Sequence, residues 1–236
     1  MLLKRIAVLL TIAYSLIGCS QAPRQTPTTS QLPITPTSSA SFQHNDYMLP
    51  PNSYQIWLLQ GDHQYKVEAY KNFLAQQHIQ FVVPDFEMFR SARDWQQCNY
   101  DEYDVPDPSV WQNAVPTLRL LKQLVDEGLV HDIEVTSSYR SPYLNHCAGG
   151  AKSSSHLRNS AIDFRMGSIQ PDEQEQLKIH TQKLKLCKFW QQRGQAFNMG
   201  LGIYNTGQIH IDTQGYRTWG PDHSWRSSLC GEIIPD

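Results

Sequence analysis

The sequence lacks three features that would each indicate a different class of protein. Its 236 residues carry 20 Lys and Arg against 22 Asp and Glu, and the isoelectric point is near 6.5, so we expect no nucleic-acid partner. No two of its five cysteines have CxxC spacing, which argues against a cysteine zinc site. The apolar run at residues 6–17 is shorter than the roughly 20 residues that a membrane span needs. The 40% hydrophobic fraction is that of a globular domain with a core.

The first residues have the pattern of a signal peptide. Two basic residues precede the apolar run at residues 6–17, and the LIGC sequence that ends at Cys19 resembles the bacterial lipobox. In that motif residues 1–18 are removed, and the cysteine is lipidated as the new N-terminus. Ser20, rather than Asp, follows it, which by known sorting rules favours the outer membrane of a Gram-negative cell, facing the periplasm. The alternative is an ordinary secretory signal with a chance cysteine.

The cysteines fit an oxidising compartment. With Cys19 assigned to a lipid, four cysteines remain, and an even number predicts two disulfides. Four cysteines allow three pairings, of which we favour Cys98–Cys147 and Cys187–Cys230. Residues 19–45 are rich in Ser, Thr, Pro and Gln and lack the apolar content to pack, so we expect a disordered tether.

Hydrophobic periodicity divides the rest of the chain into helices and strands. Helical spacing and capping residues predict helices over residues 67–77, 86–95, 109–127 and 173–193. Pro116 inside the third of these predicts a kink or a later start. Apolar runs and alternation predict strands over residues 79–83, 133–137 and 161–164, and a hairpin of residues 199–204 and 208–212. This order of elements indicates an α+β fold, an antiparallel sheet with helices packed on it.

Three side chains that are distant in the sequence form a ligand set for one metal ion. His156, Asp163 and His210 provide two imidazoles and a carboxylate, a common set for catalytic zinc that leaves a fourth position for water. On one helix the first two would lie roughly 10 Å apart along the axis. A turn must therefore separate them, and Asn159 tolerates the left-handed conformation that a turn needs. Alternation puts His210 and Asp212 on one face of their strand.

Several segments resemble the zinc D-Ala-D-Ala carboxypeptidase family, whose relatives include vancomycin-resistance D,D-dipeptidases and peptidoglycan L,D-endopeptidases. Residues 137–142 (SSYRSP) resemble the family's S-G-Y-R-S/N-P segment, and residues 154–163 resemble its S-x-H-x-x-G-x-A-x-D motif. Residues 200–204 (GLGIY) and 210–220 (HIDTQGYRTWG) resemble the C-terminal part of one branch. The resemblance covers about residues 109–220 and implies the family's fold, its zinc ion and its peptidase activity.

The chain departs from the family pattern at two positions. Asn159 stands where the family usually has Gly, and both residues tolerate a positive φ, so the turn is kept. Gly207 stands three residues before His210, where many members have a general-base Glu or Asp. The identity of the general base is therefore open.

The resemblance also implies roles for side chains around the metal. Arg140 would bind a substrate carboxylate or the developing oxyanion, with a structural salt bridge as the alternative. We choose Asp212 as the general base, and its other role would be to orient the imidazole of His210. Ser154 and Tyr139 would contact the substrate, with loop hydrogen bonding and core packing as their alternatives.

These observations predict an exported lipoprotein that is a zinc peptidase. It would hydrolyse stem or cross-link peptides of peptidoglycan with a metal-activated water, as a D,D-carboxypeptidase or endopeptidase. The alternative, motivated by Gly207, is a non-catalytic, zinc-stabilised lipoprotein that binds peptidoglycan or a partner. We expect peptidoglycan peptides as substrates, membrane contact through the lipid anchor alone, and a monomer. Residues 46–108 would be an N-terminal extension packed on a zinc peptidase domain at residues 109–236.

Overall fold

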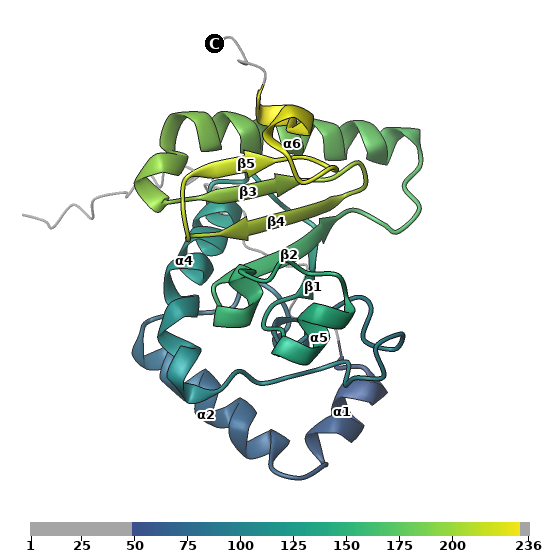
Figure 1. Cartoon of the computed structure of the whole chain (residues 1–236), viewed down its shortest axis with the longest axis vertical. Helices are drawn as coiled ribbons and strands as arrows, with labels where there is room; N and C mark the ends of the chain where they lie inside the picture. The colour runs from purple at the N-terminus through teal and green to yellow at the C-terminus, as the bar shows by residue number, and fades with distance from the viewer. Residues whose placement is uncertain (1–48, 232–236) are drawn as a thin grey trace, which may run out of the picture. The chain divides into compact units, whose positions relative to one another are not determined.

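The computed structural model describes residues 49–231 and shows an α+β fold, as the sequence predicted (Figure 1). A mixed, mostly antiparallel sheet of five strands packs with helices. No helix among the described residues is both long and apolar enough to cross a membrane. The predicted signal peptide at residues 1–18, the lipid-bearing Cys19 and the tether at residues 19–45 lie outside the described residues.

The elements follow one another along the chain with short connections. The α-helices and strands are α1 (Asn52–Leu58), α2 (His63–Gln76), α3 (Asp85–Met88), α4 (Ala114–Asp126), β1 (Ile133–Ser137), α5 (Pro142–Cys147), β2 (Ala161–Met166), α6 (Glu173–Arg193), β3 (Gly200–Ile203), β4 (Gln208–Asp212) and β5 (Arg217–Trp219). The short 3-10 helices are η1 (Pro108–Asn113), η2 (Ser155–Arg158), η3 (Gly194–Phe197), η4 (Trp225–Ser227) and η5 (Leu229–Gly231).

The sheet has the strand order β1-β2-β4-β3-β5, which Figure 1 shows from its lower to its upper edge. Every neighbouring pair is antiparallel except β3 and β5, which are parallel. The register of β1 against β2 shifts between Val135 and Ser137, so that Ser137 pairs with Asp163. On its other side Asp163 pairs with His210. This register puts two predicted metal ligands side by side at the centre of the sheet.

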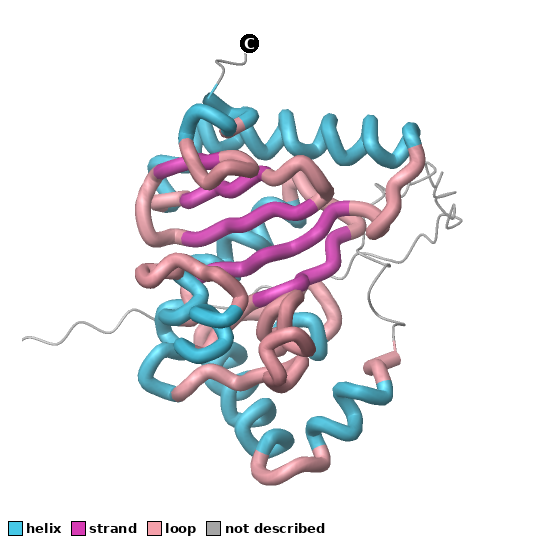
Figure 2. Tube along the Cα trace, turned by 45° about the vertical axis from the view of Figure 1, so that its right-hand side comes forward, coloured by secondary structure: helices cyan, strands magenta, loops and turns pink. Residues whose placement is uncertain are grey.

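The two faces of the sheet differ in chemistry because side chains alternate along each strand. One face is apolar and fully buried, and it shares a core with residues of α4 and α6; it carries Val135, Ile162, Phe164, Leu201, Ile209 and Ile211. The other, which we call the polar face, carries Glu134, Asp163, Arg165, Gln208, His210 and Asp212. Figure 2 shows the sheet with helices behind it. The core therefore holds the strands in register while the polar face remains for chemistry.

Residues 52–103 share the same core as the sheet. Tyr54, Trp57 and Tyr70 are buried, and aromatic contacts link Tyr54 with Phe89 and Tyr103. Burial of these large rings stabilises the packing of the segment by an estimated 1.5–3 kcal/mol for each fully buried side chain. The predicted boundary between residues 46–108 and 109–236 stays a prediction.

Two predicted elements of this segment are wrong. Residues 79–83 form no strand, because no neighbouring strand pairs with them and the Ile79 N–H instead donates to the Leu74 carbonyl at the end of α2. The helix predicted over residues 86–95 ends at Met88 as α3. Beyond it, the Phe89 carbonyl accepts a hydrogen bond from the Asp104 N–H, so the backbone pairs with a distant segment rather than continuing the helix.

Other predictions from the sequence are confirmed. The helix predicted over residues 109–127 starts late: η1 comes first, and Pro116 lies in the first turn of α4. The disulfides are Cys98–Cys147 and Cys187–Cys230, the favoured pairing. The first joins the loop after α3 to α5, and the second joins α6 to η5.

Candidate metal centre

A left-handed turn brings the first two predicted ligands together. His156 lies in η2, where the Ser154 hydroxyl accepts a hydrogen bond from the His156 backbone N–H at 3.3 Å. The helix ends at Asn159, which has φ 54° and ψ 37°. The Asn159 side-chain amide donates to the Tyr70 hydroxyl at 3.0 Å and is buried. This confirms the predicted turn, which directs the chain into β2 and returns Asp163 to His156.

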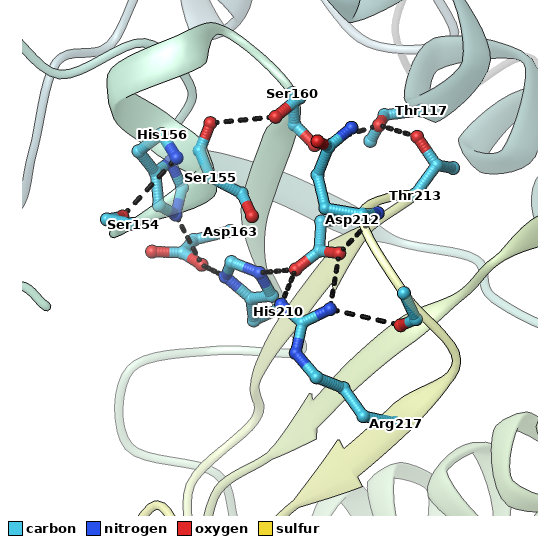
Figure 3. Close-up of polar contacts among 12 residues, drawn as sticks. Thr117, Ser154, Ser155, His156, Ser160, Asp163, His210, Asp212, Thr213 and Arg217 are labelled. Carbon is cyan, nitrogen blue, oxygen red and sulfur yellow. Dashed lines mark hydrogen bonds and ion pairs between the residues drawn. The ribbon is translucent and has the colours of Figure 1, made fainter. Parts of the chain in front are cut away.

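Strand pairing supplies the third predicted ligand. Asp163 on β2 lies opposite His210 on β4, and both side chains point to the polar face (Figure 3). Asp163 Oδ1 is 3.2 Å from His156 Nε2 and 2.8 Å from His210 Nδ1. One ligand atom from each of the three residues lies within 4.8 Å of the others. The structure therefore gathers the three predicted ligands into one cluster.

Hydrogen bonding determines which nitrogen of His156 faces the cluster. Its Nδ1 contacts the Ser138 carbonyl oxygen, which can only accept, so Nδ1 carries the proton and donates. In a neutral imidazole the other nitrogen then carries a lone pair. That nitrogen, Nε2, faces Asp163 and also lies 3.3 Å from Arg140 Nη2, which donates to it.

In His210 the proton is on the other ring nitrogen, Nε2. Its Nε2 lies 2.9 Å from Asp212 Oδ2, and an ionised carboxylate only accepts, so Nε2–H donates to Asp212. Nδ1 is then the nitrogen with the lone pair, and it faces Asp163 Oδ1. Both histidines thus direct an acceptor nitrogen at an acceptor oxygen.

Arg140 donates to His156 Nε2 from one side, but no described residue places a proton between Asp163 Oδ1 and the two imidazole nitrogens that face it. Acceptor atoms in this arrangement repel one another unless a cation lies among them. Imidazole nitrogen and carboxylate oxygen are the donor atoms that zinc prefers, with bonds of about 2.0–2.2 Å. Asp163 and His210 are each 8% exposed, so the cluster is not sealed from solvent. The residues present therefore fit a zinc ion.

Comparison with known proteins agrees with this geometry. The sequence model of one family, described as Peptidase M15, matches residues 86–212, a span that includes all three ligand candidates and Arg140. The chain belongs to the peptidase M15 family. No curated protein and no solved structure matches the chain. M15 peptidases are zinc-dependent, so zinc is the cofactor.

Charge in the M15 site favours an ionised carboxylate between the imidazoles. Burial alone would raise the pKa of Asp163, but the neighbouring His156 and Arg140 side chains hold it well below its usual value. Burial and the Arg140 charge lower the pKa of His156, which keeps that ring neutral. Burial would also lower the pKa of His210, but the Asp163 and Asp212 carboxylates on either side of the ring raise it.

Asp212 lies behind His210 rather than beside the open position. Its carboxylate is fully buried, and it accepts two bonds from Arg217, at 3.1 and 2.6 Å, and one from the Gln214 N–H at 2.9 Å. Burial would raise the pKa of Asp212, but the hydrogen bond from His210 and the bonds from Gln214 and Arg217 lower it to about 2. A side chain at Gly200 would clash with this pair, since a Cβ there would lie 2.6 Å from Asp212 Oδ1. This position favours the orienting role of Asp212 over the general-base role.

Arg140 lies in the segment after β1 and contacts the side chains of the predicted metal ligands. Its Nη2 contacts Asp163 Oδ2, and its Nε donates to Ser137 Oγ at 2.8 Å. The salt bridge that the sequence left as an alternative is therefore present, with Asp163 as the partner. No residue in the range 49–231 accepts a hydrogen bond from Nη1, so one edge of the guanidinium remains available.

The other two residues predicted to bind substrate have different surroundings. Ser154 caps η2 through its hydroxyl and thus supports His156. Tyr139 is partly buried and makes none of the hydrogen bonds of the metal cluster. Neither side chain contacts the three atoms that would bind the metal.

Sequence reasoning assigned no role to three groups that support the histidines or their partners, although it considered Trp219 as a border of the pocket. The Ser138 carbonyl fixes His156, and Arg217 holds Asp212. The Trp219 ring lies 5.1 Å from the His210 ring, centroid to centroid, and its indole N–H donates to the Tyr204 hydroxyl. The glycines at alternate positions of β3 were the available signal, because a strand without side chains on one face leaves room for a large neighbour.

Proposed function

We propose that this M15 family member is a zinc peptidase that hydrolyses stem or cross-link peptides of peptidoglycan, of the D,D-carboxypeptidase or endopeptidase type. Family membership supports a peptidase that acts on peptidoglycan-type substrates. The observation that carries the proposal is the convergence of three lone pairs, on His156 Nε2, Asp163 Oδ1 and His210 Nδ1, at one place on the polar face.

His156, Asp163 and His210 would hold the metal. When bound there, zinc would supply a Lewis acid that lowers the pKa of water to about 7 and polarises a peptide carbonyl. The Ser138 carbonyl keeps the proton of His156 on Nδ1, so that Nε2 stays available. Asp212 keeps the proton of His210 on Nε2, so that its Nδ1 stays available, and Arg217 keeps Asp212 ionised.

Arg140 is the residue that we assign to the substrate. Its Nε and Nη2 are held by Ser137 and Asp163, which fixes the plane of the guanidinium. The free Nη1 edge then offers hydrogen bonds in a set direction, which suits a carboxylate of the substrate peptide. Lys would not replace Arg here, because an ammonium cannot contact three groups in one plane.

We further propose that the protein is an exported lipoprotein anchored by a lipid on Cys19, most simply in the outer membrane and facing the periplasm. The leader sequence supports this proposal. Two disulfides among the described residues agree with an oxidising compartment. Metabolic labelling with a fatty-acid analogue should label wild type and not Cys19→Ala, and labelling of both would contradict the proposal.

The non-catalytic alternative has one observation in its favour. Gly207, at the position where many family members have a catalytic acid, lies against the Met166 backbone carbonyl so closely that no Cβ fits. The backbone of this turn therefore excludes a carboxylate at position 207. A protein that binds zinc and peptidoglycan without cleavage would fit this finding.

Mass spectrometry of muropeptides separates the two functions. Protein reconstituted with zinc is incubated with purified muropeptides, alongside chelated protein and zinc-treated His210→Ala. The peptidase proposal predicts shortened or separated stem peptides only with zinc-loaded wild type. Intact muropeptides after incubation with protein that contains one zinc per chain would contradict it and favour the binding function.

A further inference from the structure

Tyr204 follows β3 on the polar face of the sheet. Along β3 the positions that face the metal cluster alternate as Gly200, Gly202 and Tyr204, and Gly202 lies opposite His210. The Tyr204 N–H donates to the Gln208 carbonyl, so the strand pairing extends to this residue. Gly200 and Gly202 have no side chain, so Tyr204, one residue after β3, is the first residue of this row whose side chain extends over the polar face.

The Tyr204 hydroxyl accepts a hydrogen bond and does not use its own proton in it. Trp219 Nε1–H lies 3.2 Å from the Tyr204 hydroxyl oxygen, and an indole can only donate, so the phenol oxygen accepts. No residue in the range 49–231 accepts a hydrogen bond from that hydroxyl. The O–H therefore remains free to donate to a molecule bound at the site.

The surrounding residues restrain the Tyr204 ring. Trp219 packs on Gly202, where a Cβ would lie 2.7 Å from the indole, and it contacts the His210 ring on its other side. His223 packs edge-on against Tyr204, with ring centroids 5.8 Å apart. His223 has φ 60°, a strained conformation for a residue other than glycine, and such strain is concentrated at functional sites.

Tyr204 stays protonated near neutral pH. Burial raises its pKa; the Trp219 hydrogen bond opposes this, and the negative charge of Asp163 adds to it. Trp219 links the phenol to the metal cluster, because its ring contacts the His210 ring and its N–H contacts the Tyr204 hydroxyl. The polar groups already discussed have other roles, since Asp212 is paired with Arg217, and the free edge of Arg140 is assigned to a substrate carboxylate.

We propose that the Tyr204 hydroxyl donates a hydrogen bond to the substrate oxygen that becomes negative during peptide hydrolysis. The oxygen of water bonds to the carbonyl carbon as an O–H bond of the water breaks, and the C=O electron pair moves to the carbonyl oxygen. When this pair returns, the C–N bond breaks, and the leaving nitrogen takes the proton that the water has given up. Tyr204 donates throughout and transfers no proton. The proposal rests on the peptidase function given above.

The test compares Tyr204→Phe with Tyr103→Phe. Both changes remove one hydroxyl, but the Tyr103 hydroxyl contacts Ser53 and lies outside the metal cluster. We expect Tyr204→Phe to lower kcat on muropeptides by about 10²–10³-fold, the usual effect of one oxyanion donor. KM and zinc content should stay within about twofold, since the bond forms only in the transition state. A peptide phosphinate, which carries the negative oxygen, should bind Tyr204→Phe more weakly by calorimetry.

Each other outcome overturns the inference or its basis. Unchanged kcat and phosphinate affinity in Tyr204→Phe, beside an active wild type, overturns the role of Tyr204 alone. Loss of zinc from that variant makes Tyr204 structural and also overturns it. If Tyr204→Phe does not fold, His223→Ala decides, because His223 is exposed and only restrains the ring; an unchanged kcat there overturns the proposal. Zinc-loaded wild type that neither cleaves nor binds the phosphinate refutes the peptidase function itself.

Discussion

The polar side of the sheet carries two groups of charged side chains with opposite arrangements. The donor cluster, formed by His156, Asp163 and His210, is named for the three lone pairs that it can donate to a metal. In hydrogen-bond terms these atoms are all acceptors, and they face one another at 2.8 and 3.2 Å. In the paired cluster, beside β1, Glu134 contacts Arg90 with one carboxylate oxygen and Arg165 with the other, while Glu87 accepts from the Val135 N–H at 2.8 Å. (The members of the paired cluster are Glu87, Arg90, Glu134 and Arg165.)

This difference separates a site that needs a ligand from one that does not. In the paired cluster both oxygens of Glu134 contact guanidinium groups and Glu87 accepts a backbone hydrogen bond, so each carboxylate has a partner within the protein. In the donor cluster the supporting groups, the Ser138 carbonyl and Asp212, take the protons of both imidazoles away from the centre. Charged residues that are buried in pairs need no ligand, so the direction of the lone pairs is what indicates a metal site.

The largest effect should follow loss of one of the three side chains that bind the metal. His210→Ala removes one of the three converging atoms, so a zinc ion would retain two protein ligands and bind weakly. We expect muropeptide cleavage to fall to the level of the chelated protein, and zinc to be lost during dialysis, as measured by plasma mass spectrometry. Full activity with one zinc per chain would show that the donor cluster is not the metal site.

The second largest effect should be on the pH dependence of the free energy of unfolding, through Glu87 of the paired cluster. Burial raises the pKa of Glu87 to about 7 from 4.5 in the unfolded chain. The folded protein therefore binds more protons between these values, and the free energy of unfolding falls as pH rises from about 4.5 to 7. Glu87→Gln should remove this fall and be more stable than wild type by roughly 3 kcal/mol above pH 7, and equally stable below pH 4.5.

Chemical denaturation of both proteins across this pH range measures the difference. Glutamine still offers an oxygen to the Val135 N–H, so the hydrogen bond is preserved. A stability difference that does not change with pH would show that Glu87 titrates normally and that the two clusters differ less than we infer.

A smaller effect is expected for Asp212→Asn. The amide keeps the shape of the carboxylate but removes the charge that holds the proton on His210 Nε2. Zinc affinity should fall by about 10–100-fold, as measured by competition with a coloured chelator. If Asp212 were instead the general base, kcat would fall while zinc affinity stayed at the wild-type value.

The smallest effect should come from breaking the paired cluster. Arg165→Met removes one of the two partners of Glu134 and leaves Arg90 in place. Because the ions are partly exposed, stability should fall by no more than about 1 kcal/mol. Zinc affinity should stay within about twofold of wild type, which makes this variant the matched control for His210→Ala. A large loss of zinc would show that the clusters are coupled.

Much of the donor cluster could be predicted because its geometry is local. The alternation around His210 and the turn at Asn159 follow from residue types, and strand pairing then brings Asp163 to His210. The sequence offered two roles for Asp212, and the choice between them could not be made, because it depends on which imidazole nitrogen faces the carboxylate. That detail follows from the register of β2 against β4, which no pattern within one strand specifies.

Other features depended on contacts between distant segments. The parallel pairing of β3 with β5 puts Trp219 over Gly202 and against Tyr204, and residues 200–204 alone give no sign of that neighbour. Residues 79–83 have the composition of a strand, but a strand also needs a partner, and the end of α2 takes the Ile79 N–H instead. Composition therefore predicts which segments are buried better than it predicts their partners.

The central claim is that the lone pairs of His156 Nε2, Asp163 Oδ1 and His210 Nδ1 bind one zinc ion. Anomalous diffraction at the zinc edge from crystals of the zinc-loaded protein tests it most directly. We predict a single peak on the polar face of the sheet, at about 2.0–2.2 Å from each of these three atoms. A peak bonded to His210 Nε2, or one that lies away from the three residues, would contradict the account.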